Sequence, residues 1–527
     1  NAFIPEEYWT LDANLKVEGE KKLLRAKFYG KGNKKLTIGS REEMEQILKE
    51  LEGAEYTVDE IRKGERVKKA PVPFTTSTLQ QEASKALNFA TSKTMRIAQQ
   101  LYEGIDIKGN GTVGLITYLR TDSTRVSAEA DQTVREYIGG TYGPEYVASR
   151  DISSARDGRG VQDAHEAIRP TDVTRTPAAM KDSLTRDQFR LYQLVWKRFV
   201  ASRMQPAKYE TTSVRIAAGE YRFTVAASRI AFEGFRCVYT EADEEKEENN
   251  VLVKGLDENA KLSKESFETK QHFTQPPPRY TEASLIKTLE ENGIGRPSTY
   301  ASIISTITGR DYVKREAKQL HPTELGEAMT KLLREKFPKI VNTKFTASME
   351  SSLDKVGEGQ EDYIKMLHAF YDDFDVTLQK VKEEMKDVKI KLAEDETDIP
   401  CEKCGRMMVV KVGRYGKFLA CPGYPECKNT KPLVQETGAF CPRCGGKVIM
   451  KKSKRGYPFY GCSNYPDCTF MTWDQPTAET CPKCGKSLFK RRGGLIVCLN
   501  EDCGYERKAE RKKKGAAESE EKPEAES

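Results

Sequence analysis

Two stretches of the chain alternate apolar and polar residues in the manner of half-buried strands. In residues 8–73 the alternation is clear in WTLDANLKV and LLRAKFYG, whereas REEMEQILKELEG has helical spacing. In residues 208–240 both YRFTVAAS and FRCVYT place apolar groups at every second position. Because strand side chains point alternately to two faces, we predict strands in both stretches, with one helix in the first.

The segment between these two stretches opens with helical patterns. Thr78 and Gln81 have the spacing of a capping box, and a second helix, capped by Thr91 or Ser92, is predicted to end at Gly104. Apolar residues repeat on one face of each helix, which we interpret as ordinary core packing.

A third region is strongly helical. It follows the proline-rich boundary at 275–280 and contains TEASLIKTLEENGIG, ended by Gly293, and RPSTYASIISTI, with Pro297 in its first turn. Two helices around a glycine-containing turn resemble a helix-turn-helix, a shape that many unrelated proteins share. Helical spacing continues to about Lys391.

Composition narrows the class of protein. A chain of 527 residues exceeds a single hydrophobic core, so we expect about three to five domains. No apolar run approaches the roughly 18–20 residues of a membrane span, and we predict no membrane contact. The net charge of +7 is weak evidence for nucleic acid binding. The first residues, NAFIPEEYW, lack the features of a signal peptide, so we expect the interior of a longer cytoplasmic protein.

The cysteines are concentrated in the last part of the chain. Cys237 stands alone, and twelve of the thirteen cysteines follow residue 400 in three sets, each a CxxC pair and a later second pair. The sets are Cys401, Cys404, Cys421 and Cys427; Cys441, Cys444, Cys462 and Cys468; and Cys481, Cys484, Cys498 and Cys503. This layout predicts three structural zinc ions held by four thiolates each, with free thiols or disulfides as the alternative.

Basic and aromatic residues lie between the zinc ligands. They are Arg414, Tyr415, Lys417, Phe418, Lys454, Arg455, Tyr457, Phe459, Tyr460, Phe489, Lys490, Arg491 and Arg492. Cations that follow phosphates, beside rings on which bases stack, are typical of a surface that binds single-stranded nucleic acid. The alternative is that the rings only pack the small core of each ribbon.

The segment GLITYLRTDSTRVS, residues 114–127, carries a candidate nucleophile. If residues 116–120 are extended, Tyr118, Arg120 and Asp122 project from the same side. Tyrosine with its usual pKa of about 10 is a poor nucleophile, so phosphoryl transfer to it needs a nearby cation and a group that grips phosphate. Arginine suits the second task. The alternative is a strand with an exposed polar edge.

The segment DAHEAIRPTDV, residues 163–173, offers a second candidate. If a helix begins there, His165 and Arg169 lie four residues apart on one face and could bind a phosphate. A surface ion pair between Glu166 and Arg169 is the alternative.

A third candidate lies in residues 278–307. The turn Gly-Arg-Pro-Ser-Thr-Tyr presents Arg296, Ser298 and Thr299 at a helix start, where free backbone amides favour a phosphate.

Four motifs together resemble a known family. GLITYLRTDS, AHEAIRPTDV, PPPRYTEASLIKTLEENGIGRPSTYASIISTI and FTASMESSLDKVGEG, in this order, are similar to the motif series of type IA DNA topoisomerases, specifically bacterial topoisomerase I. The resemblance extends from the first residues to the end of the third cysteine set.

The resemblance implies a mechanism without ATP. Tyr118 would attack a phosphodiester of single-stranded DNA, forming a 5′-phosphotyrosyl link, and Arg120 would stabilise charge on the phosphate. After strand passage the free 3′-hydroxyl would reverse the reaction, so that negatively supercoiled DNA relaxes. The residues implied to contact DNA are Asp122, His165, Arg169, Arg296, Thr299 and Tyr312.

The resemblance also implies a multidomain α+β fold. A helical base, a strand-rich arch and a helix-rich tyrosine domain would form a toroid, followed by three small zinc ribbons. The boundaries we expect are 1–12 (end of a helical base segment), 13–75 (arch), 76–204 (tyrosine domain), 205–275 (arch), 276–395 (helical base), 396–435, 436–476 and 477–507 (zinc ribbons) and 508–527 (disordered tail).

The family pattern normally includes a TOPRIM domain, which carries a general acid and the aspartates that bind magnesium. We find no such unit, and we interpret Asp372, Asp373 and Asp375 as a solvated helix face. We therefore expect a fragment that relaxes no DNA by itself. The resemblance further implies a bacterial, nucleoid-associated monomer, with RNA polymerase as a candidate partner of the zinc ribbons.

Two other functions remain open. A topoisomerase III-like decatenase is one, although three four-cysteine ribbons argue against it. The other is a module that only binds DNA or polymerase, with Tyr118 idle. Trapping a covalent DNA adduct that needs Tyr118 separates the enzyme from the binding module.

Overall fold

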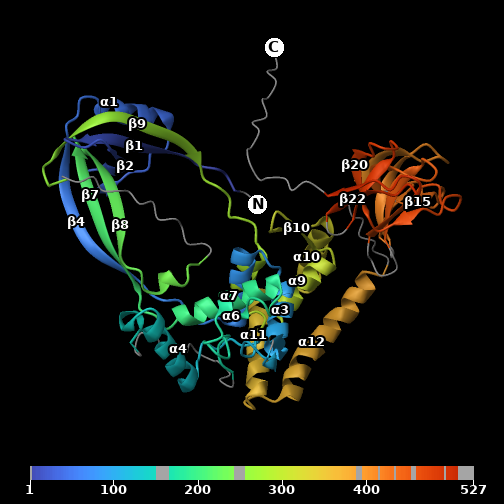
Figure 1. Cartoon of the computed structure of the whole chain (residues 1–527). Coiled ribbons are helices and arrows are strands. Elements are labelled where there is room, and N and C mark those ends of the chain that lie inside the picture. The colour runs from blue at the N-terminus through green and yellow to red at the C-terminus, as the bar shows by residue number, and fades with distance from the viewer. Residues whose placement is uncertain are drawn as a thin grey trace, which may run out of the picture. The chain divides into compact units, whose positions relative to one another are not determined.

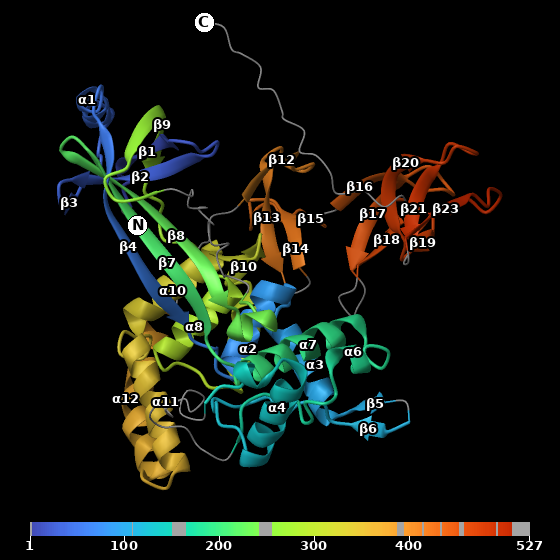
Figure 2. The same cartoon turned by 60° about the vertical axis from the view of Figure 1, so that its left-hand side comes forward.

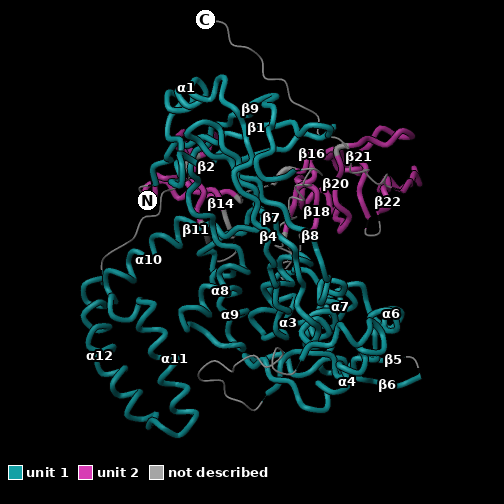
Figure 3. Tube along the Cα trace, turned by 90° about the vertical axis from the view of Figure 1, so that its left-hand side faces the viewer, with its two compact units in different colours: residues 1–390 teal, residues 391–527 magenta. Residues whose placement is uncertain are grey.

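A computed structural model describes residues 3–107, 109–149, 165–241, 256–386, 395–413, 416–432, 435–452, 458–491 and 494–508. The chain forms two compact units, residues 1–390 and 391–527, which Figure 3 distinguishes by colour. None of the described helices has both the length and the apolar character needed to cross a bilayer.

The first unit contains a seven-stranded antiparallel sheet, the arch sheet (Figure 1). Its order is β1 (Glu7–Val17), β9 (Lys261–Phe273), β4 (Tyr56–Lys68), β7 (Ala207–Ala218), β8 (Tyr221–Phe232), β2 (Leu23–Lys31) and β3 (Lys34–Lys35). An additional pairing of β1 with β2 closes six of these strands into a ring. Closure leaves these strands without a free edge.

Alternating apolar residues fill the interior of the arch sheet, as the sequence pattern predicts. Leu11, Ala13 and Leu15 on β1 are at most 2% exposed and pack with Phe223 of β8. The predicted helix is α1 (Arg41–Glu50), and Ser40 caps it by accepting a hydrogen bond from the backbone of its first turn. The assignment of residues 1–12 to the helical base is wrong, because β1 begins within them and pairs with β2 and β9.

The long strands β4, β7 and β8 extend beyond the core of the arch sheet to a group of helices that includes α2 (Thr76–Glu82), α3 (Thr91–Glu103) and α7 (Arg186–Ala201) (Figures 1 and 2). The prediction of a strand at FRCVYT is wrong. The structure has a short 3-10 helix there, η3 (Gly234–Cys237). Gly234 has a φ of +51°, and a Cβ on it would lie 2.4 Å from the carbonyl oxygen of Gln205, so the chain must turn here on a glycine. Phe235 is thereby buried with the helices.

The tyrosine segment, residues 76–204, is inserted between β4 and β7. Its elements are α2 (Thr76–Glu82), the π-helical turn η1 (Ala83–Leu87), α3 (Thr91–Glu103), β5 (Ile105–Ile107), β6 (Gly111–Val113), α4 (Ala128–Thr141), η2 (Pro144–Tyr146), α6 (Pro177–Met180) and α7 (Arg186–Ala201). Its core includes the fully buried rings of Phe74, Tyr192 and Phe199.

The caps of the first two helices differ from the prediction. The capping box of α2 is formed by Thr75 with Thr78, so the helix begins earlier than expected. Neither Thr91 nor Ser92 is the N-cap of α3. That position is Ala90, which makes no side-chain cap, and the first amide of the helix is satisfied from elsewhere in the fold.

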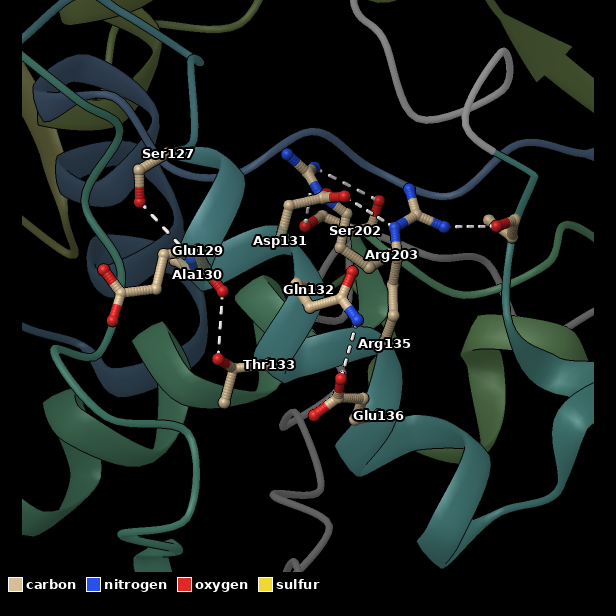
Figure 4. A network of polar contacts seen from close by, with 11 residues as sticks. Ser127, Glu129, Ala130, Asp131, Gln132, Thr133, Arg135, Glu136, Ser202 and Arg203 are labelled. Carbon is tan, nitrogen blue, oxygen red and sulfur yellow. Dashed lines mark hydrogen bonds and ion pairs between the residues drawn. The ribbon is translucent and has the colours of Figure 1, made fainter.

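A partly buried ionic cluster fixes α4 to the end of α7 (Figure 4). The Asp131 carboxylate accepts hydrogen bonds from the Nε atoms of Arg135, at 2.6 Å, and Arg203, at 2.7 Å. The Arg135 guanidinium also donates to the carbonyl oxygen of Ala148. Burial alone would raise the pKa of Asp131, but the hydrogen bonds and charges of Arg135 and Arg203 lower it below the usual value.

Replacing Asp131 by Asn should lower the free energy of unfolding of the first unit by about 2–4 kcal/mol, because Arg203 would remain buried without its counter-ion. Since the pKa of Asp131 is depressed in the folded state, its contribution is present above the ordinary aspartate pKa and is lost as the pH falls through the folded value. Denaturant unfolding at neutral and acidic pH measures this. The control is Glu129→Gln, an exposed change on the same helix. Equal stability of both variants at neutral pH would contradict the expectation.

The helical base, residues 276–386, begins with α8 (Glu282–Glu291) and α9 (Tyr300–Gly309), which share the buried residues Ile286, Tyr300 and Ile304. A hairpin of β10 (Val313–Glu316) and β11 (Gln319–Pro322) follows, which the sequence pattern did not reveal because each strand has four residues. Three helices complete the base: α10 (Glu324–Lys336), α11 (Thr343–Gly357) and α12 (Tyr363–Glu384).

The second unit consists of three four-stranded antiparallel sheets, one for each cysteine set. The first has β12 (Asp395–Pro400), β13 (Met407–Gly413), β14 (Gly416–Ala420) and β15 (Thr430–Pro432); the second β16 (Gln435–Phe440), β17 (Lys447–Lys452), β18 (Pro458–Cys462) and β19 (Met471–Thr472); the third β20 (Gln475–Thr480), β21 (Ser487–Arg491), β22 (Leu495–Cys498) and β23 (Glu506–Lys508). The predicted tail lies outside the described residues from residue 509 on.

Candidate active site and zinc ribbons

Tyr118 lies on a bent loop, so the condition that residues 116–120 are extended is not met. Ile116 forms an isolated bridge with Pro170, and the amide of Thr117 donates to the carbonyl oxygen of Arg169 at 2.9 Å. Beyond Tyr118 the chain bends at Leu119 instead of continuing the pairing.

Thr76 causes this bend, and it is a positioning residue that the sequence did not reveal. Its hydroxyl donates to the carbonyl oxygen of Leu119 at 2.7 Å and accepts from the amide of Thr121 at 2.8 Å. Its own amide donates to the carbonyl oxygen of Thr121 at 2.9 Å. Because Thr76 is fully buried at the start of α2, these hydrogen bonds hold the backbone on both sides of Arg120.

Replacing Thr76 by Val should disorganise this loop, because two buried backbone groups lose their partner while the volume of the side chain is kept. We expect a loss of about 1–3 kcal/mol in stability and a loss of at least ten-fold in any reaction of Tyr118. The measurements are thermal unfolding and the yield of covalent DNA adduct. Thr133→Val is the control, because Thr133 is exposed and its hydroxyl bonds to a carbonyl oxygen of its own helix, α4. An undiminished adduct yield in Thr76→Val would refute the role.

The Tyr118 ring is half-buried and lies between two other rings. Tyr102 meets it edge-on at 5.5 Å between ring centroids, and His165 lies at 4.9 Å with a tilted ring. Arg120 and Asp122 beside it are exposed. No hydrogen bond to the Tyr118 hydroxyl occurs among the described residues. The structure therefore places a phenol, an imidazole and an exposed arginine together at the surface.

Arg169 is held by protein groups, so the ion-pair alternative is what the structure has. Its Nε donates to a Glu166 oxygen at 2.7 Å, and its side chain is 11% exposed. It also donates to the carbonyl oxygen of Pro170 at 3.0 Å. The helix that we supposed here is absent, because Ile168 bridges to Phe74 in an extended segment. Asp163 lies outside the described residues. A DNA contact by Arg169 stays a prediction.

Arg296 joins the third and fourth motifs. Its guanidinium donates to both carboxylate oxygens of Asp354 on α11, at 3.2 and 2.6 Å, and the hydrogen bond to Asp354 raises the pKa of Arg296 above its usual value. The Thr299 hydroxyl accepts from the Arg296 amide at 2.8 Å. Both residues are half-buried and Ser298 is exposed, so the turn is fixed internally before any ligand binds.

The other two predicted contact residues are Asp122 and Tyr312. Burial raises the pKa of Tyr300, the first residue of α9, to about 12, and the negative charges of Glu290 and Asp122 contribute in the same direction. Tyr312 is half-buried beside α10, and its carbonyl oxygen accepts from the amide of Thr323 at 3.0 Å. Asp122 is thus brought near the third motif, whereas Tyr312 packs within the base.

The cysteine sets fit zinc. In each set the four sulfur atoms lie within 4.8 Å of one another, and none of the cysteines forms a disulfide. Backbone amides also point at the sulfurs, for example from Gly423 to Cys421 at 3.4 Å. Four thiolates in this arrangement match a structural zinc ion, which ties the strands of each ribbon together.

Of the three aspartates that we interpreted as a solvated helix face, Asp375 is half-buried. Asp372 and Asp373 are exposed on α12, near His368 and Lys339 respectively. Within the described ranges the three cysteine sets are the only groups of three or more side chains that could hold a metal.

Comparisons with known proteins show the family of the chain. The family model described as DNA topoisomerase matches residues 1–368. The chain belongs to the bacterial type IA DNA topoisomerase family. The model of the topoisomerase DNA-binding C4 zinc finger matches residues 398–436, 438–477 and 478–512. Full-length topoisomerase I from Thermotoga maritima is similar in structure, with 35% identity and a TM-score of 0.63, covering 82% of this chain and 67% of that one. The chain is therefore a type I DNA topoisomerase with three zinc ribbons.

The ribbons of this topoisomerase use their rings in two ways. Phe489 is fully buried and packs against Phe470, so its ring belongs to a core, as the alternative held. Phe418, Phe459 and Tyr460 are half-buried. Lys490 and Arg491 are exposed. The predicted residues Arg414, Tyr415, Lys454, Arg455, Tyr457 and Arg492, and the side chain of Lys417, lie outside the described part of the chain.

Three of the most exposed rings in the described part of the topoisomerase ribbons were not predicted from the sequence. Tyr424 and Tyr465 are 69% and 65% exposed, and each stands in a Tyr-Pro pair between the last two cysteines of its ribbon. Trp473 is 61% exposed and lies beside Phe459. The repeated Tyr-Pro pair, which the third ribbon lacks, was the signal that could have found the two tyrosines.

The second and third ribbons share one hydrophobic core. Phe470 of the second packs on Phe489 and Val497 of the third. The amide of Phe440 donates to the hydroxyl of Ser487 at 2.8 Å across the same boundary. These two ribbons of the topoisomerase therefore form one body.

Proposed function

We propose that Tyr118 cleaves single-stranded DNA and that the enzyme relaxes negatively supercoiled DNA without ATP. The observation that carries this proposal is the placement of the Tyr118 phenol at the surface, beside His165 and next to the exposed Arg120. Thr76 holds the backbone of this loop.

The chemistry follows from these groups. The phenolic oxygen of Tyr118 gives up its proton and attacks phosphorus, and the bond from phosphorus to the 3′-oxygen of the neighbouring sugar breaks. That oxygen takes up one proton, so one proton is lost and one is gained. Arg120 stabilises the negative charge that grows on the phosphate, because its guanidinium is permanently charged. Its exposure allows it to reach a backbone that binds over the loop. The free 3′-hydroxyl later attacks the phosphotyrosine and restores the strand.

His165 contributes by position. Its ring lies 4.9 Å from that of Tyr118 and is exposed, so it can donate a hydrogen bond to a DNA phosphate at the same place. We propose Asp122, Arg169, Arg296, Thr299 and Tyr312 as further DNA contacts, with Arg169 and Arg296 requiring release from Glu166 and Asp354 to bind phosphate directly.

The test adds the TOPRIM domain, to which the family resemblance assigns the general acid and the aspartates that bind magnesium. The chain is mixed with a labelled single-stranded oligonucleotide and magnesium, with and without a separately produced TOPRIM domain. We expect a covalent adduct on a denaturing gel when the TOPRIM domain is present, and no relaxation of supercoiled plasmid by the chain alone. Absence of an adduct under both conditions favours a module that only binds DNA, and relaxation by the chain alone contradicts our expectation.

The proposal includes three further properties. We propose a monomer located with the DNA in the bacterial cytoplasm, and RNA polymerase as a partner of the zinc ribbons. Sedimentation of the chain and its co-purification with polymerase, with and without residues 396–507, test the first and the last.

A further inference from the structure

A buried carboxylate connects the tyrosine segment to the helical base. Glu282, in the first turn of α8, is 5% exposed. One of its oxygens accepts hydrogen bonds from the amide and from the hydroxyl of Thr91, both at 2.7 Å. The other oxygen pairs with Arg315 of β10. Thr91 is the first residue of α3, so Glu282 supplies the cap that α3 lacks in its own sequence.

A second carboxylate on the same helix makes a similar contact. Glu290, near the end of α8, accepts a hydrogen bond of 2.5 Å from the hydroxyl of Ser77 in the first turn of α2. Ser77 is 2% exposed, whereas Glu290 lies at the exposed rim. Helix α8 therefore directs one carboxylate to the start of α2 and another to the start of α3, where the helix dipole favours negative charge.

These contacts are of a kind that can be broken and remade. When the contacts of α8 with α2 and α3 break, the amide, hydroxyl and carboxylate groups form hydrogen bonds with water. Breaking these contacts therefore costs much less free energy than exposing an equal number of apolar side chains. Closure in turn restores a charge-assisted capping contact that orients the partners. Polar contacts of this type suit an interface that must open during every reaction cycle.

We propose that Glu282 with Thr91, and Glu290 with Ser77, form a latch that holds the tyrosine segment closed on the base. The proposal rests on the proposed function, since a strand can pass only if the segment that carries the phosphotyrosine moves away from the part that holds the other DNA end. Glu282 is the main element, because it is buried and bonds to Thr91 twice. It is a positioning residue.

The first test measures opening without DNA. Hydrogen exchange of the full chain is compared between the unchanged protein and Glu282→Gln, with Thr91→Val as a second variant and Glu291→Gln as the matched control on the exposed face of α8. We expect exchange at least ten-fold faster at the start of α3 and along α2 and α8 in both latch variants. Exchange of α7 should be unchanged in both latch variants, and exchange of all segments should be unchanged in the Glu291→Gln control. Unchanged exchange at α3, or equal acceleration of α7, overturns the proposal.

The second test separates a latch from a merely structural role. With a TOPRIM domain and oligonucleotide present, Glu282→Gln should raise the steady-state level of covalent adduct several-fold, because an open gap keeps the 3′-hydroxyl away from the phosphotyrosine. Structural damage would lower the adduct instead, so an equal or lower level overturns the latch. If no variant forms an adduct, the proposed function fails, and the exchange experiment still decides on the latch.

Discussion

Phenylalanine at position 118 is expected to abolish the covalent DNA adduct and to leave DNA affinity within about two-fold. The substitution removes one oxygen, and that oxygen is the only atom that the mechanism joins to phosphorus. Loss of a nucleophile typically costs about a thousand-fold or more in rate. The ring itself should keep its place, because its contacts with Tyr102 and His165 are made by ring faces and edges.

The neighbouring tyrosine provides the matched control for this experiment. Tyr102 lies 5.5 Å from Tyr118 and is 39% exposed, so it is also accessible to DNA. Tyr102→Phe should retain most of the adduct on a denaturing gel. An adduct that persists in Tyr118→Phe, or that disappears only in Tyr102→Phe, would show that the nucleophile has been misassigned.

Removal of zinc should unfold the three ribbons and leave the first unit folded. Binding of zinc to four thiolates is worth about 10–16 kcal/mol in small zinc domains, far more than the core of one ribbon can contribute. We expect affinity for single-stranded DNA to fall at least ten-fold, because the exposed rings of Tyr424, Tyr465 and Trp473 lose their support.

The zinc experiment follows chelator titration by circular dichroism and by fluorescence anisotropy of a labelled oligonucleotide. The shared core of the second and third ribbons predicts that two of the three ions leave together and the third separately. The unfolding transition of the first unit should not move, since the arch sheet and the tyrosine segment have cores of their own. DNA affinity that survives complete zinc removal would contradict the role of the ribbons.

Features encoded by local spacing could be predicted from the sequence. The three zinc sites were predicted correctly, because a zinc ribbon places its cysteine ligands on two short turns. The strands of the arch sheet followed from alternation, and residues 1–12 were misassigned because the pattern does not say which strands become neighbours. The pairing of β1 with β9 joins residues more than two hundred positions apart, for example Glu7 with Phe273.

The geometry of the active site depended on partners that are distant in sequence. The bend after Tyr118 is set by Thr76, which is 43 residues away from Leu119. Arg296 looked free to bind phosphate at its turn, yet it pairs with Asp354, 58 residues further on. In the same way Glu282 caps α3 from a separate part of the fold. A sequence shows which side chains carry charge but not which buried partner satisfies them.

The most direct test of the central claim is to identify the atom of the protein that is joined to DNA. The adduct formed with the supplied TOPRIM domain is digested with protease and nuclease, and the modified peptide is located by mass spectrometry. We predict a nucleotide linked through its 5′-phosphate to Tyr118, in the peptide that contains GLITYLR. A link through a 3′-phosphate, or a link to any other residue, would contradict the account.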